Sequence, residues 1–202
     1  SDVCSSDLAM IANWFNTKLK IKFPERKTIF GRKLHELRYG ENPHQQSSIY
    51  VNDYQDKQLR FNKIHGKELS YNNYNDIFAS LSISKTLPKN KGTVIIKHAN
   101  PSGVSIENDH LKSYLSAMNC DPISAYGGVV SCNFKLSQKI AKEIVKNFYE
   151  VIIANGFDQS VLKLFKNKKN LRLIDSSKIE LNKNKKITSG INSFLMQSTD
   201  NM

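Results

Sequence analysis

The sequence predicts an α/β protein in which a sheet is covered by helices. Between residues 75 and 174, short runs of β-branched residues alternate with segments whose apolar residues recur at helical spacing. Such alternation is typical of a layered domain, because each helix packs back on the sheet that its flanking strands form. With 202 residues, 39% of them hydrophobic, the chain is long enough for one good-sized core.

The first part of the chain predicts a helix followed by extended structure. Residues 1–10 are left unassigned, as either a disordered or a non-native end. Residues 11–20 are predicted to be helical, residues 27–45 to be extended with loops, and residues 47–52 to form a strand. The apolar stripe of the helix consists of Ile11, Trp14, Phe15 and Leu19.

The alternating part then predicts these elements in order. Helices are expected around residues 77–81 and 111–118, from a cap at Ser137 to Phe148, and around residues 161–165. Strands are expected at residues 93–97, 128–132, 150–154 and 171–174.

A Lys–His pair stands at the end of the most β-branched run. Residues 94–96 lead into Lys97 and His98, and Pro101 and Gly103 are predicted to end the strand. Open α/β sheets bind ligands at the carboxyl ends of their strands. A cation beside a group that titrates near neutral pH suits acid–base chemistry on an anionic or carbonyl-bearing substrate. The alternative is an ordinary solvated strand edge.

Three further segments join residues 94–103 in one pattern. They are residues 37–45 (LRYGENPHQ), 66–73 (GKELSYNN) and 121–128 (DPISAYGG). In this order, the four segments resemble the transformylase domain of the aminoimidazole carboxamide ribonucleotide formyltransferase/IMP cyclohydrolase family. Members of this family are bifunctional enzymes of purine biosynthesis. The ordered set is specific, whereas each segment alone is only suggestive.

The resemblance implies a cytidine-deaminase-like layered fold for the first lobe of the transformylase domain. It covers residues 11–202, which are interpreted as a partial transformylase domain entered by a linker helix. The family's cyclohydrolase domain and second lobe find no counterpart, so the chain is interpreted as a fragment with little transformylase activity of its own. The alternative interpretation is an inactive, basic binding or scaffold fragment.

The resemblance also implies a reaction and its residues. The family moves a formyl group from the co-substrate 10-formyltetrahydrofolate to the amine of 5-aminoimidazole-4-carboxamide ribonucleotide, and then closes the ring to IMP. His98 matches the family's catalytic histidine, and Lys97 matches the neighbouring lysine that contacts the substrate. The positions that match nucleotide-binding residues are Arg38, Tyr39, Asn72, Tyr126, Gly127 and Glu150.

Tyr126 departs from the pattern, because the family usually has Phe there, and the added hydroxyl needs a partner if it is buried. Asn73 is expected to hold its loop. His44 fits two roles equally well, either a turn-stabilising histidine or a contact behind the substrate-binding residues.

Composition narrows the class of partner and compartment. The net charge of +12 fits either nucleic acid or solvated, Lys-rich turns such as residues 166–170, and the absence of aromatic platforms favours the turns. No apolar run approaches the ~20 residues that span a bilayer, and no signal peptide opens the sequence. Cys4, Cys120 and Cys132 form no CxxC motif. Composition therefore favours a soluble, cytoplasmic protein without nucleic acid or membrane partners. The family resemblance implies small-molecule nucleotide and folate substrates, and a homodimer for the intact enzyme.

A zinc deaminase is the rival enzyme class, because it shares the implied fold. That chemistry needs H-x-E and P-C-x-x-C around one metal. Here His98 is followed by Ala99 and Asn100, and no cysteine pair has ligand spacing. No metal site is therefore predicted.

Overall fold

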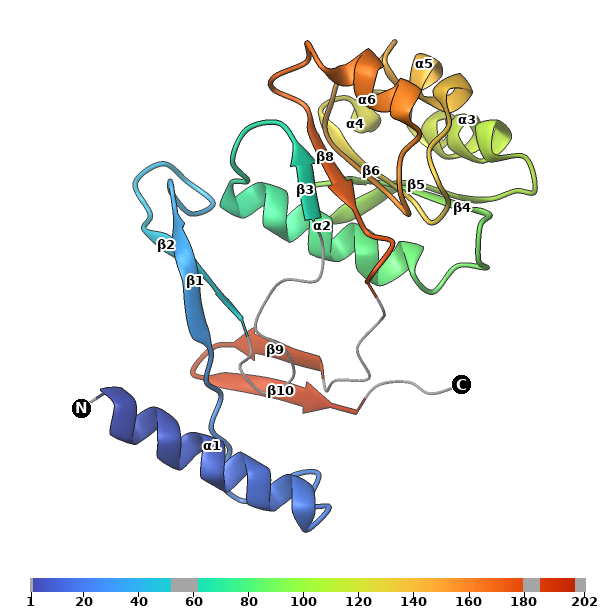
Figure 1. The fold of residues 1–202 in the computed structure, drawn as a ribbon. Coiled ribbons are helices and arrows are strands. Elements are labelled where there is room, and N and C mark those ends of the chain that lie inside the picture. The colour runs from blue at the N-terminus through green and yellow to red at the C-terminus, as the bar shows by residue number, and fades with distance from the viewer. Residues whose placement is uncertain (1, 52–61, 180–185, 199–202) are drawn as a thin grey trace.

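The computed structural model describes residues 2–51, 62–179 and 186–198 (Figure 1). Among these residues, a six-stranded mixed sheet has the order β3-β8-β7-β6-β4-β5. The three strands β6, β7 and β8 run parallel, and the other neighbours pair antiparallel. The strands are β3 (Asn62–His65), β4 (Gly92–Lys97), β5 (Asn100–Ile106), β6 (Gly128–Cys132), β7 (Tyr149–Ala154) and β8 (Arg172–Asp175).

Helices cover both faces of this sheet, so the predicted α/β class is confirmed. One face carries α2 (Tyr71–Ser84), which packs on it through Ile77 and Leu81 (Figure 1). The opposite face carries α3 (His110–Cys120), α4 (Pro122–Ala125), α5 (Gln138–Ile144) and α6 (Gln159–Phe165). The finer cytidine-deaminase-like layering stays a prediction.

Strand residues alternate between the two cores. In β6, Val130 packs in the core beneath α3, α5 and α6, whereas Val129 packs in the core beneath α2. Successive strand side chains point to opposite faces, so a strand buried on both sides becomes a continuous apolar run. Because β6 is buried on both sides, its apolar run predicts a strand at residues 128–132, and the structure shows the same bounds.

Among the described residues, the remaining elements pair with no strand of this sheet (Figure 1). They are α1 (Asp2–Lys18), the hairpin of β1 (Arg32–Leu37) and β2 (Ser47–Val51), and the hairpin of β9 (Lys186–Gly190) and β10 (Ser193–Gln197). The helix predicted at residues 11–20 is confirmed as far as Lys18. It begins earlier, at Asp2, so residues 2–10, which the sequence left unassigned, are helical. The strand predicted at residues 47–52 is confirmed to Val51, and Asn52 lies outside the described residues. No helix in the described part of the chain is long and apolar enough to cross a membrane.

Two of the differences from the sequence prediction concern where an element ends. The helix expected to reach Phe148 ends at Ile144, and its cap residue Ser137 makes no side-chain hydrogen bond. The strand that ends at Lys97 is not stopped by Pro101 and Gly103, because both residues lie inside β5. Proline is tolerated there because β5 is an edge strand of the sheet, where a missing N–H breaks no inner ladder.

The three cysteines differ in reactivity. Cys4 and Cys120 are exposed, whereas Cys132 is buried in β6, and this burial raises the pKa of its thiol to about 12. Since the thiolate is the reactive form, the Cys132 thiol stays protonated and unreactive at pH 8. We expect a coloured thiol reagent at pH 8 to label two cysteines quickly and the third only after addition of denaturant. Three fast thiols in the native chain would contradict the burial of β6.

Candidate functional site

The Lys–His pair lies on a strained hairpin turn. Lys97 at the end of β4 pairs with Asn100 at the start of β5, so His98 and Ala99 form a two-residue loop. Their φ angles of 53° and 60° are both left-handed. This is the backbone of a type I′ turn, which normally takes Asn-Gly. A residue with a side chain costs about 1–3 kcal/mol in this region, so the surrounding structure must hold the turn.

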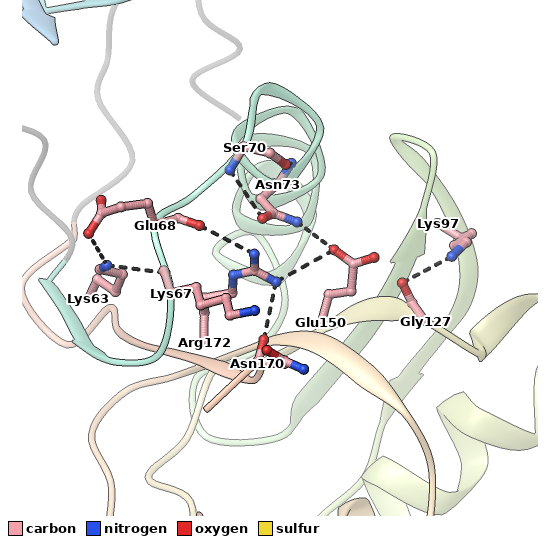
Figure 2. A network of polar contacts seen from close by, with 10 residues as sticks. All are labelled: Lys63, Lys67, Glu68, Ser70, Asn73, Lys97, Gly127, Glu150, Asn170 and Arg172. Atoms are coloured by element: carbon pink, nitrogen blue, oxygen red, sulfur yellow. Dashed lines mark hydrogen bonds and ion pairs between the residues drawn. The ribbon is translucent and has the colours of Figure 1, made fainter. Parts of the chain in front are cut away.

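The start of α2 faces this turn. Ser70 and Asn73 form a capping box, in which the Ser70 hydroxyl accepts from the Asn73 amide and the Asn73 side chain accepts from the Ser70 amide. Asn73 therefore holds its loop, as the sequence predicted. Its Nδ2 also donates to Oε2 of Glu150 at the start of β7, over 2.8 Å (Figure 2).

Two neighbouring side chains of α2 reach other segments. The Asn72 Nδ2 donates to the backbone oxygen of Glu41 over 3.3 Å, which ties α2 to the loop between β1 and β2. The Asp76 Oδ1 accepts the backbone N–H of Ala99 over 2.7 Å, which ties α2 to the turn. The first turns of α2 thus join three of the four sequence motifs.

Glu150 lies between Asn73 and an arginine (Figure 2). An Nη1 of Arg172 is 3.8 Å from Oε2 of Glu150, and the same guanidinium donates to the backbone oxygens of Glu68 and Asn170. The Arg172 Nε is buried without a hydrogen-bond partner among the described residues. This network fixes the position of the Glu150 carboxylate.

Lys97 bonds directly to the motif at residues 121–128. Its Nζ donates to the backbone oxygen of Gly127 over 3.0 Å (Figure 2). The Gly127 N–H in turn donates to the Phe148 oxygen over 2.8 Å, and the Tyr126 ring packs against the Phe148 ring with centroids 5.3 Å apart. Gly127 has a φ of 70°, and a Cβ there would lie 2.9 Å from the Lys97 Nζ, so a glycine suits the position.

Charges of both signs meet around the turn. Burial raises the pKa of the Asp76 carboxyl, and the Ala99 hydrogen bond and the charges of His98 and Lys97 partly oppose this rise. The negative charge of the Glu150 carboxylate also raises the pKa of Asp76. His98 itself is exposed, so its imidazole is open to a ligand.

Arg38 and Tyr39 lie on the loop that follows β1. The Arg38 guanidinium stands 5.6 Å from the centre of the Tyr39 ring. Arg38 and His44 line an open cavity of about 610 Å³ between β1 and β2. Within the described residues, no hydrogen bond or ion pair joins the Arg38 side chain to Lys97 or Glu150. The Asn72–Glu41 hydrogen bond and the contact of the Tyr74 hydroxyl with the His35 Nε2, over 3.5 Å, link the β1–β2 hairpin to α2.

Tyr126 is exposed, with 67% of its surface accessible, so its hydroxyl needs no buried partner.

A second cavity, of about 480 Å³, adjoins Phe148 and Tyr149 and is rimmed by Lys67, Lys168 and Lys169. The described residues contain no group of three or more His, Cys, Asp or Glu side chains that could hold a metal ion.

Sequence reasoning missed two members of this network. Asp76 lies three residues after Asn73, on the same side of a helix, and that spacing was a signal available in the sequence. Arg172 is a charged residue at the start of a strand whose two central residues are apolar, which is a weaker signal. Neither could be connected to the Lys–His pair without the packing of α2 across the sheet.

Comparison with known proteins places this site in context. The family model described as the AICARFT/IMPCHase bienzyme matches residues 3–202. The chain is 40% identical over 180 residues to the bifunctional purine biosynthesis protein PurH of Leptospira biflexa, covering 89% of this chain and 34% of that protein. It is 43% identical over 201 residues to PurH of Buchnera aphidicola subsp. Schizaphis graminum, covering 90% of this chain and 37% of that protein. It is 36% identical over 197 residues to PurH of Bacillus cereus, covering 96% of this chain and 38% of that protein. The chain therefore spans about a third of the length of these curated relatives.

Proposed function

The chain belongs to the AICARFT/IMPCHase bienzyme family, as its four motifs predicted, and from that premise we propose that it provides the nucleotide side of a formyltransferase site in purine biosynthesis. The reaction would transfer the formyl group of 10-formyltetrahydrofolate to 5-aminoimidazole-4-carboxamide ribonucleotide. Ring closure to IMP is proposed as the second activity of the whole enzyme. The observation that carries the proposal is the α2 network, which joins the His98 turn, Glu150 and the loop after β1.

His98 is proposed as the base of this reaction. The substrate amine is a poor nucleophile, because its lone pair is delocalised into the ring and toward the carboxamide. As the amine nitrogen bonds to the formyl carbon, the proton leaves that nitrogen for the neutral imidazole. A positioned base of this kind contributes typically ~10²–10⁴-fold to the rate.

Lys97 is proposed to stabilise the oxyanion that this attack creates. Its ammonium already donates to the Gly127 oxygen, which holds it beside the turn without neutralising its charge. A cation aimed at developing negative charge lowers the barrier most in a preorganised site. When the intermediate collapses, the bond between the formyl carbon and N10 of the folate breaks. The electron pair stays on N10, which takes up a proton, leaving tetrahydrofolate and the formylated amine.

The other predicted residues are proposed to hold the nucleotide. The planar Arg38 fork suits phosphate or carboxamide oxygens, with Tyr39 beside it. Asn73 and Arg172 both lie at Oε2 of Glu150, which leaves Oε1 to accept a substrate hydroxyl. The exposed Tyr126 ring and the Gly127 backbone offer a flat surface for the base.

Homodimerisation of the whole enzyme in the cytoplasm is also proposed. Its support is the apolar surface of the segment around α1, where Trp14 and Phe15 are about half exposed and Leu19 more so. Exposed apolar patches of this kind usually mark contact surfaces. Nucleic acid and membrane are not proposed as partners.

The proposal is tested by titrating the 202-residue chain with the ribonucleotide and by assaying formyl transfer. We expect weak, saturable nucleotide binding and little turnover, because the chain spans about a third of its relatives' length and we propose that the remainder supplies further walls of the site. Activity should appear in a chimaera in which this chain replaces the matching segment of the Buchnera aphidicola relative.

Two outcomes would count against this proposal. Salt-sensitive binding to any polyanion, without preference for the nucleotide, would favour the alternative of a basic scaffold. Full turnover by the 202-residue chain alone would show that the active site has been misplaced.

A further inference from the structure

The His98–Ala99 turn adopts a backbone that its own residues disfavour. Both φ angles are left-handed, although neither residue is glycine or asparagine. Within the hairpin, the turn is supported by the pairing of Lys97 with Asn100 and by a hydrogen bond from the Asn100 side chain to the His98 oxygen, over 2.8 Å. The strand pairing exists in any two-residue hairpin, and the Asn100 side chain acts on the His98 carbonyl, so neither contact explains why an alanine is accepted at position 99.

Asp76 supplies the contact from outside the hairpin. Its Oδ1 accepts the Ala99 N–H over 2.7 Å, across 23 positions of sequence. The carboxylate is held on α2, whose side chains Ile77 and Leu81 are buried against the sheet. Hydrogen bonds from a backbone N–H to a carboxylate are among the stronger ones in proteins, and the partial burial of Asp76 strengthens this one further.

We propose that Asp76 is a positioning residue that holds the His98–Ala99 turn in its left-handed form and so presents the His98 imidazole to the substrate. This inference rests on the proposed function for the role of His98.

The hydrogen bond from Ala99 to Asp76 would offset the backbone strain of the left-handed turn. If Asp76 offsets the strain at Ala99, then removing the strain by another route should remove the need for Asp76. Glycine adopts left-handed φ angles without a steric cost. An Ala99→Gly substitution should therefore rescue a chain that lacks the Asp76 carboxylate.

The first test uses nuclear magnetic resonance on the 202-residue chain. In Asp76→Ala, we expect the Ala99 amide to exchange with solvent about tenfold faster or more, since its partner is gone. The coupling between the Ala99 amide and α protons, which reports φ, should move away from its left-handed value. The double variant Asp76→Ala/Ala99→Gly should recover the left-handed turn. Asn75→Ala, an exposed neighbour on the same helix, is the matched control and should change neither signal.

The second test measures formyl transfer in the chimaera. A turn that is populated one tenth of the time lowers kcat by about tenfold, so Asp76→Ala should reduce kcat while KM for the nucleotide stays within about twofold. Asp76→Asn, which keeps an oxygen acceptor, should lose less, and Ala99→Gly should restore most of the activity of Asp76→Ala.

The outcomes separate this inference from the proposed function. Unchanged exchange and coupling of Ala99 in a folded Asp76→Ala chain would overturn the inference, and so would failure of Ala99→Gly to rescue it. If His98→Ala leaves turnover of the chimaera intact, the proposed function fails instead.

Discussion

Replacing His98 with alanine in the chimaera is expected to lower kcat by ~10²–10⁴-fold, the usual contribution of a general base. Nucleotide affinity should change little, because a base acts mainly in the transition state. The values of kcat and kcat/KM should therefore fall together. Steady-state kinetics with each substrate varied in turn measures this.

His110→Gln is the matched control for that experiment. His110 also lies beside the sheet, but its Nε2 bonds to the Asn90 oxygen just before β4, at the opposite end of that strand from Lys97. Its replacement should leave kcat within about twofold of the parent, because the His110 ring stacks on Phe134 with centroids 4.0 Å apart, away from the His98 turn. A loss of nucleotide affinity in His98→Ala with an unchanged kcat would make His98 a contact residue rather than a base.

Replacing Gly103 with alanine is expected to be strongly destabilising. A Cβ at Gly103 would lie 1.9 Å from the backbone oxygen of Ala117, so β5 and α3 would have to separate. Overpacking a dense core costs typically about 1–3 kcal/mol and occasionally more, and backbone against backbone has little room to relax. At ~2–4 °C per kcal/mol for a chain of this size, we expect the melting temperature to fall by about 6 °C or more.

Circular dichroism during thermal unfolding of the 202-residue chain measures this change. Gly190→Ala is the control, because the nearest atom to its Cβ would be the Ser193 hydroxyl oxygen at 3.0 Å, and that hydroxyl can rotate aside. A Gly103→Ala chain that melts like the parent would mean that α3 does not pack against β5 as the structure shows. This experiment does not depend on any activity.

The sequence by itself determined the α/β class and most elements of the sheet. In β6 and β7, both faces are buried, so burial alone demands an unbroken apolar run, and residues 128–132 and 150–154 carry that run in the sequence. The motifs likewise pointed to Lys97 and Gly127, which the structure joins by a hydrogen bond, and the family comparison confirmed the family to which those motifs belong.

Only the tertiary structure decided where the β4 strand turns and what holds the turn. The local signals, Pro101 and Gly103, pointed to a stop beyond His98, whereas the chain reverses at His98–Ala99 and both signals lie within β5. A His-Ala pair has no intrinsic preference for a type I′ turn. Its conformation depends on a hydrogen bond from Ala99 to Asp76, and Gly103 is needed because α3 leaves no room for a Cβ.

The same holds for Glu150, whose partners Asn73 and Arg172 come from the start of α2 and from β8. A pattern of apolar residues records which side of an element is buried, because burial acts on each residue separately. It does not record which polar atoms meet across the sheet, because those distances depend on how α2 and the strands pack together.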